Sequence, residues 1–178
     1  MQTENQITFW GLTLKTIIVH TVTYFMMGIL ALTFLEYKTA FAEPVTREYM
    51  RQVDEPIVAL GPALQFIRGL IFAAAFYPLR EVLFGRKKGW LITWLLLVSL
   101  GILSTFGAAP GSIEGLLYTK MSIRLQISGW LEVMTQAFLL SSILYYWINH
   151  PEKKWLTWIL GIIYVLVIVF SIMGVIFG

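Results

Sequence analysis

Five long apolar runs, separated by polar stretches, organise the chain. Each is roughly 20 residues long, which is what an α-helix needs to cross a hydrocarbon core of about 30 Å at 1.5 Å per residue. The pattern predicts membrane-spanning helices at residues 15–36, 61–84, 90–109, 128–148 and 155–177. Tryptophans near the ends of these runs favour the same boundaries, because the amphipathic indole prefers a membrane interface. We therefore expect an all-α, polytopic membrane protein whose five helices form a single domain over residues 1–178.

Two of the predicted connections are short and basic, and they indicate the orientation of the bundle. The sequence "FGRKKGW" joins the second and third runs, and "NHPEKKW" joins the fourth and fifth. Loops rich in Lys and Arg stay on the cytoplasmic side, so we expect the amino terminus inside and the carboxyl terminus outside. The cytoplasmic basic residues are then Lys15, Arg80, Arg86, Lys87, Lys88, Lys153 and Lys154. The outer ones are Lys38, Arg47, Arg51, Lys120 and Arg124.

The two longer connections are predicted to face outward. In the first, residues 45–53 follow Pro44 and predict a short interfacial helix with Tyr49, Met50 and Val53 on one face; a solvated loop is the alternative. In the second, Ser112 is a candidate helix cap that places Glu114 in the first turn.

Beyond this cap, polar and apolar residues alternate over residues 121–128, which predicts an extended segment with one wet face. This second connection is then either a re-entrant or interfacial lid or a simple connector.

Composition places the chain in the bilayer. Hydrophobic residues make up 58% and charged residues 13%, with a mean hydropathy of +0.75. Soluble domains contain about a quarter charged residues, so a wholly soluble protein is excluded. The first run is long for a signal peptide and is not followed by a small-residue cleavage site, so we expect it to be retained. The net charge of +3 comes mainly from residues that flank apolar runs, which favours anchoring at lipid headgroups over binding of nucleic acid.

Two charged residues lie within predicted spans, and each has an amide on the same helix face. Arg68 follows Gln65 by three residues, and Glu132 precedes Gln136 by four. Because a charge inside a bilayer is costly, the similar depths of Arg68 and Glu132 predict an ion pair. One interpretation is that these four residues fix the packing of the second and fourth spans. The other is that they line a polar site in which Arg68 binds a phosphate or carboxylate and Glu132 sets its position.

His20 lies on a polar face of the first span, with Thr13, Thr16 and Thr23 at helical spacing and Tyr24 beside it. It is either a hydrogen-bonded packing residue or a group that relays protons or ligates a metal or haem. With His150 in a loop, a second haem ligand is lacking, and metal-binding spacings are absent. The chain has no cysteine, and we expect no metal and no cofactor. The candidate catalytic acids and bases are Glu132, Glu114 and His20.

The third and fifth spans indicate where in the bundle the polar site should lie. The third and fifth carry no charge and are predicted to face lipid, so the polar site should lie among the first, second and fourth. Pro78 predicts a kink in the second span.

These patterns favour a component that binds or transports a small solute or a lipid headgroup, or a small subunit of a membrane assembly. A lipid-modifying enzyme and a purely structural scaffold are the alternatives. The expected partners are the lipid bilayer, an anionic small molecule or lipid headgroup, and a membrane protein or a second copy of the chain. Compact size and short loops favour a prokaryotic plasma (inner) membrane.

Overall fold

The computed structural model describes residues 7–105 and 107–177, and this part of the chain is helical with turns and loops between the helices. Three helices are long: α1 (Phe9–Phe34), α8 (Ile123–Asn149) and α9 (Lys154–Phe177). Two are of intermediate length: α4 (Gln65–Phe76) and α6 (Gly89–Val98). The short elements are α2 (Tyr37–Ala42), α3 (Pro44–Arg47), η1 (Pro56–Leu60), α5 (Arg80–Leu83), η2 (Ser99–Leu103) and α7 (Ile113–Tyr118).

Within residues 7–105 and 107–177, four stretches are long and apolar enough to cross a membrane. They are Phe9–Phe34, Pro56–Phe76, which combines η1 and α4, Ile123–Asn149 and Lys154–Phe177. Large apolar side chains cover their outer surface: on α9, Trp158 is 71% exposed and Phe170 is 56% exposed. Water does not stabilise such a surface, whereas lipid does. These features support an integral membrane protein.

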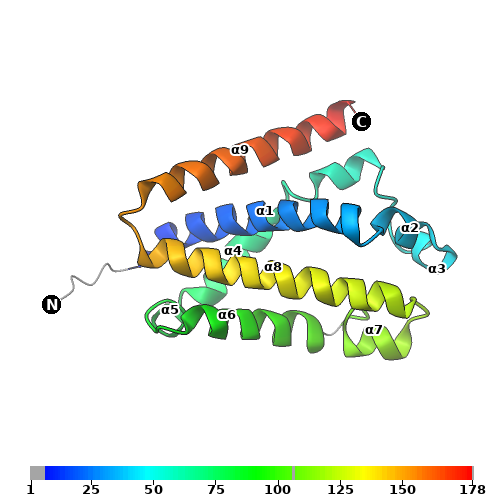
Figure 1. Cartoon of the computed structure of the whole chain (residues 1–178), viewed down its shortest axis with the longest axis horizontal. Coiled ribbons are helices and arrows are strands. Elements are labelled where there is room, and N and C mark those ends of the chain that lie inside the picture. The colour runs from blue at the N-terminus through cyan, green and yellow to red at the C-terminus, as the bar shows by residue number, and fades with distance from the viewer. Residues whose placement is uncertain (1–6, 106, 178) are drawn as a thin grey trace.

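Helix α1 is the centre of the bundle. It packs against α4, α8 and α9, and α6 packs on the far side of α8. Figure 1 shows α9, α1, α8 and α6 side by side in this order, with α4 crossing behind them. The two helices approach closely at Gly69 of α4, where an added Cβ would lie only 2.7 Å from Ile17 Cα of α1. Glycine at this position therefore lets the α1 and α4 backbones touch.

The two kinds of connection lie at opposite ends of the bundle (Figure 1). The turns between α5 and α6 and between α8 and α9 are at one end. Side-chain bonds join these turns, since Asn149 Nδ2 donates to Phe84 O at 3.1 Å and the Tyr145 hydroxyl donates to Arg86 O at 2.9 Å. Helices α2, α3 and α7 are at the other end, together with the last turn of α9.

The predicted span at 90–109 is too long. Helix α6 continues only through η2, whose π-helical geometry is marked by Ser104 N donating to Ser99 O at 3.0 Å. Residues 89–103 therefore rise about 22 Å, less than the roughly 30 Å of a hydrocarbon core. Two glycines and Pro110 weaken the helix in this region. In addition, side chains of α8 bind the backbone of Gly111 in a non-helical conformation with φ +85°.

The predicted spans at 15–36 and 61–84 also need correction. Helix α1 starts six residues earlier, at Phe9, because the Thr8 hydroxyl accepts from Gly11 N at 3.2 Å and caps it. Helix α4 is preceded by η1 and ends at Phe76. The kink predicted at Pro78 is a full interruption: three residues form a turn before α5 begins. Proline cannot donate a backbone hydrogen bond, which accounts for the break.

The two longer connections are partly as predicted. Ser112 does cap α7, accepting from Gly115 N at 2.8 Å, with Glu114 in the first turn. The predicted interfacial helix at 45–53 is reduced to the single turn of α3. The extended segment predicted at 121–128 is wrong: Ser122 caps α8, and the helix begins at Ile123. Burial there follows a helical period, with Leu125, Gln126, Ser128 and Gly129 buried.

Candidate functional site

A buried histidine pairs with an amide of the neighbouring helix near the middle of α1. His20 is only 2% exposed, and its Nε2 lies 3.1 Å from Gln65 Oε1 of α4. The amide orientation is fixed, because Gln65 Nε2 donates to Gly61 O at 2.9 Å. Gln65 Oε1 must then accept, so the proton of a neutral His20 resides on Nε2.

The other ring nitrogen of His20 is a buried acceptor without a partner. His20 Nδ1 is inaccessible and receives no hydrogen bond from the described residues. The ring packs edge-on against Phe72, with centroids 4.9 Å apart. A buried acceptor left unpaired costs about 1 to 3 kcal/mol, so this nitrogen favours a small donor such as water or a ligand hydroxyl.

The carboxylate of Glu132 is held by a tyrosine from the connection that follows α1. Glu132 is half-buried on α8, and the Tyr37 hydroxyl of α2 donates to its Oε2. Burial and the nearby Glu132 carboxylate raise the pKa of Tyr37, so the phenol keeps its proton and acts as the donor. Glu132 Oε1 receives no hydrogen bond from the described residues.

Arg68 does not pair with Glu132, contrary to the sequence-based prediction. The side chain of Arg68 is exposed and makes no hydrogen bond or ion pair with the described residues. The ion pairs in this part of the chain are Arg51–Glu55 at 3.0 Å and Arg124–Glu36 at 2.8 Å. Similar depths of Arg68 and Glu132 along their helices do not make the two residues neighbours. Helices α4 and α8 each pack on α1 and are not a major contact pair themselves.

Tyr24 lies on α1 one turn after His20 and is half-buried, with its hydroxyl oxygen 3.6 Å from the position that a Cβ would take at Gly61. We use the name "polar cluster" for six polar side chains of α1, α2, α4 and α8. They are His20, Tyr24, Tyr37, Gln65, Arg68 and Glu132.

The structure brings together most, but not all, of the predicted site residues. Gln136 is buried on α8 one turn beyond Glu132, and its Nε2 donates to none of the described residues. Glu114 lies apart on α7, and the loop just before α7 packs against α8 through Trp130, whose Nε1 donates to Gly111 O. Trp130 and Glu132 point in directions roughly 200° apart around a helix. Glu114 and Glu132 therefore lie on different sides of α8.

Sequence reasoning missed the role of Tyr37. Its position just after an apolar run resembles that of any interfacial tyrosine. Only the turn at Glu36, which adopts a left-handed conformation with φ 51°, directs α2 back over α8. A non-glycine residue in this conformation gives no periodic signal in the sequence.

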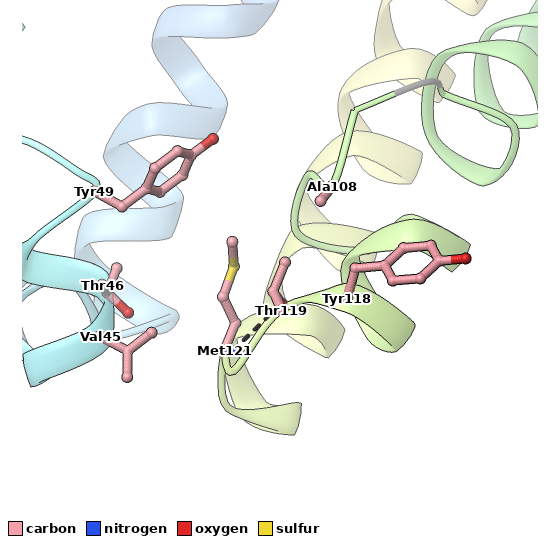
Figure 2. Close-up of a pocket in the computed structure, with 7 residues that line it drawn as sticks. All are labelled: Val45, Thr46, Tyr49, Ala108, Tyr118, Thr119 and Met121. Carbon is pink, nitrogen blue, oxygen red and sulfur yellow. Dashed lines mark hydrogen bonds between the residues drawn. The ribbon is translucent and has the colours of Figure 1, made fainter.

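A separate cavity of about 440 Å³ lies between α3 and the α7 region (Figure 2). On one side are Val45, Thr46 and Tyr49, and on the other Ala108, Tyr118, Thr119 and Met121. Its lining carries no charged side chain and shares no residue with the polar cluster. The Thr46 hydroxyl is buried without a hydrogen-bond partner among the described residues.

Among the described residues, no three His, Asp or Glu side chains gather closely enough to hold a metal ion. Comparison of the chain with family models, curated proteins and solved structures finds no match. We therefore base the proposed function on the polar cluster.

Proposed function

We propose that the chain is a multi-pass membrane protein that binds an anionic group, a phosphate or a carboxylate, at Arg68. The observation that carries this proposal is the unpaired guanidinium of Arg68 on an otherwise apolar stretch, Pro56–Phe76, beside the buried His20–Gln65 pair. A permanent charge within a bilayer is costly unless a partner satisfies it. Since no described residue does so, a bound anion is the partner that the chemistry favours.

The anion can come from a small solute or from a lipid headgroup. Helix α4 is half exposed along its length, so Arg68 can be reached from the lipid side of the bundle. We infer an orientation with the amino terminus in the cytoplasm, which places α2, α3 and α7 outside.

Binding is favoured over catalysis by the positions of the carboxylates. A lipid-modifying reaction that used Glu132 with Glu114 would need both at one reacting centre, and α8 separates them. Glu132 is also held by Tyr37, which suits a positioning role.

The test is ligand-induced thermal stabilisation of the purified protein in a nonionic detergent. Inorganic phosphate and dihexanoyl phosphatidic acid are the probes, because they share the anion and differ in the acyl chains. We expect Arg68→Gln to weaken binding by about 10- to 100-fold, since a charge-assisted hydrogen bond contributes about 1.5 to 3 kcal/mol. The matched control is Arg51→Gln, which removes an exposed arginine of an ion pair outside the cluster.

The two probes separate the sources of the anion. Stabilisation by both would indicate a small-anion site, and stabilisation by the lipid alone would indicate a headgroup site. If neither probe stabilises the protein, or if Arg68→Gln and Arg51→Gln bind equally well, the proposal is wrong.

A further inference from the structure

The cavity between α3 and the α7 region has the size and position of a ligand site at a membrane interface. Its volume of about 440 Å³ falls within the roughly 300 to 1,000 Å³ of small-molecule sites. It lies at the end of the bundle that carries α2, α3 and α7 (Figure 1), and two of its lining residues, Tyr49 and Tyr118, are 66% and 80% exposed. Exposed tyrosines at the end of a membrane-spanning bundle are typical of the interface. A ligand would therefore enter this cavity from the interfacial region of the lipid.

The lining restricts the charge of the ligand. None of the seven side chains that line the cavity is charged, so an ionic group inside it would lose hydration without gaining a partner. One of the lining hydroxyls, that of Thr119, is already fully used. It donates to Gly115 O at 2.6 Å, and it accepts from Met121 N at 3.3 Å and Gln126 Nε2 at 3.4 Å. The cavity thus favours a neutral ligand and leaves few hydrogen-bonding groups to hold it.

Thr46 supplies a buried hydroxyl that lacks a partner. Among the seven lining residues it alone is buried, at 1% exposed, and its Oγ1 forms no hydrogen bond with the described residues. The hydroxyl and methyl groups of threonine exchange places between staggered χ1 positions, so this hydroxyl can turn to a polar atom in the cavity. The phenols of Tyr49 and Tyr118 also form no hydrogen bond with the described residues. These three hydroxyls are too few for a sugar, which would leave several of its own hydroxyls unpaired.

Both walls of the cavity are held in place by side chains outside it. On the α3 side, Gln52 Nε2 donates to a backbone carbonyl of α2 at 2.9 Å. On the α7 side, Gln126 Nε2 of α8 donates to Gly115 O at 3.0 Å. Between the two sides, Glu36 at the start of α2 pairs with Arg124 of α8 at 2.8 Å. A cavity formed in advance in this way loses less entropy when its ligand binds.

We propose that this cavity binds an uncharged lipid with two or three hydroxyl or ester groups, such as a monoacylglycerol. The acyl chain packs against Val45, Ala108 and Met121, whose flexible thioether adapts to it, and a glycerol oxygen pairs with the Thr46 hydroxyl. This site is independent of the anion site proposed at Arg68, because the cavity shares no residue with the polar cluster.

The experiment is photolabelling of the full-length protein in phosphatidylcholine nanodiscs. The probe is monolauroylglycerol that carries a diazirine in its acyl chain, and mass spectrometry of the digested protein locates the label. We expect label on residues 45–49 and 118–121. Unlabelled monolauroylglycerol should compete at least about tenfold better than laurate or lauroyl lysophosphatidylcholine, because these place a charge in an uncharged cavity.

Variants assign the label to the cavity. Ala108→Phe fills the cavity and should abolish labelling there, whereas the control Ala42→Phe adds the same ring at an exposed position of α2 and should not. Thr46→Val keeps the shape and removes the hydroxyl, so it should weaken competition about 2- to 10-fold, the range expected for one hydrogen bond. The ligand-free melting temperature of Thr46→Val should stay unchanged or rise, since the hydroxyl has no partner among the described residues. Arg68→Gln should leave the labelling unchanged.

Several results would overturn the assignment. If a charged competitor matches monolauroylglycerol, or if label is found only on lipid-facing helices such as α9, the cavity is not a site for a neutral lipid. Equal labelling of Ala108→Phe and Ala42→Phe, or unchanged competition in Thr46→Val, would contradict the proposal in the same way. Loss of the label in Arg68→Gln would place the lipid at the anion site instead of the cavity.

Discussion

At the scale of single residues, the His20–Gln65 pair links α1 to α4 through one polar contact. Both side chains are buried, and the amide is fully oriented by Gly61 O. The hydrogen bond itself adds only a little to stability. Removing one of its two partners costs more, because the other partner stays buried without a hydrogen bond. The pair therefore stabilises the contact of α1 with α4 only as long as both members are present.

This asymmetry leads to a prediction for Gln65→Met. The variant leaves both nitrogens of His20 without a partner, so we expect a loss of about 1 to 2 kcal/mol of stability, seen as a lower melting temperature in detergent. The double variant His20→Phe, Gln65→Met should recover part of this loss. Gln136→Met is the matched control, since the buried Gln136 Nε2 already lacks a partner, and it should be neutral or slightly stabilising. A double variant less stable than Gln65→Met would contradict this account.

The sequence identified most residues of the polar cluster but misassigned their partners. His20, Gln65, Arg68 and Glu132 stood out because polar residues at helical spacing are rare in apolar runs. Partners depend on the direction in which each helix faces. Gln65 and Gly69 are the buried positions of α4 that face α1, which leaves Arg68 on its exposed flank and gives Gln65 to His20.

At the scale of elements, the segment between α6 and α8 is organised by side chains of α8. Gln126 is 2% exposed: its Oε1 accepts from Gly111 N at 2.5 Å, and its Nε2 donates to Gly115 O at 3.0 Å. Trp130, one turn later, donates to Gly111 O. The alternation of polar and apolar residues over 121–128 predicted a strand-like segment with Gln126 facing water. In the structure, the buried amide of Gln126 binds a neighbouring segment of the chain instead. The Ser112 cap was predictable because it depends only on local sequence.

We predict that Gln126→Leu releases this segment while α8 stays folded. The substitution leaves Gly111 N and Gly115 O without their side-chain partners, which should cost about 1 to 3 kcal/mol locally. Hydrogen exchange should rise in residues 107–119 and remain unchanged in α1 and α9. Gln52→Leu is the control, because it removes the comparable amide bond to Phe41 O in the other connection and should leave residues 107–119 protected. Equal exchange in the Gln126→Leu variant and the original protein would show that other contacts order the segment.

At the scale of the whole molecule, the bundle is assembled around α1, and the two short turns gather at one end of it. Hydropathy alone predicted the four long apolar stretches, because length and composition are sufficient for that. It did not predict that α6 and η2 together would be short. Residues 104–105 and 107–112 continue toward α7 without regular helix, packed in part against Trp130. Gly111 and Ser112 are buried, which is where non-helical backbone is tolerated at membrane depth, whereas Ser104, Gly107 and Ala108 are exposed. We propose that the chain completes a third crossing through this segment.

This arrangement predicts that Thr39 and Lys120 lie on one side of the membrane and Lys87 on the other. The chain contains no cysteine, so single cysteines at these three exposed positions can be labelled with a membrane-impermeant maleimide without background. With the amino terminus inside, intact cells should label Thr39→Cys and Lys120→Cys, and Lys87→Cys only after permeabilisation. If all three patterns are reversed, the crossings stand and the orientation is wrong. If Lys120→Cys is labelled together with Lys87→Cys, α6 and the segment after it do not cross. That result would also contradict the contacts of α8, because α8 would then start on the side of Lys87, whereas its Arg124 and Glu132 contact Glu36 and Tyr37 on the side of Thr39.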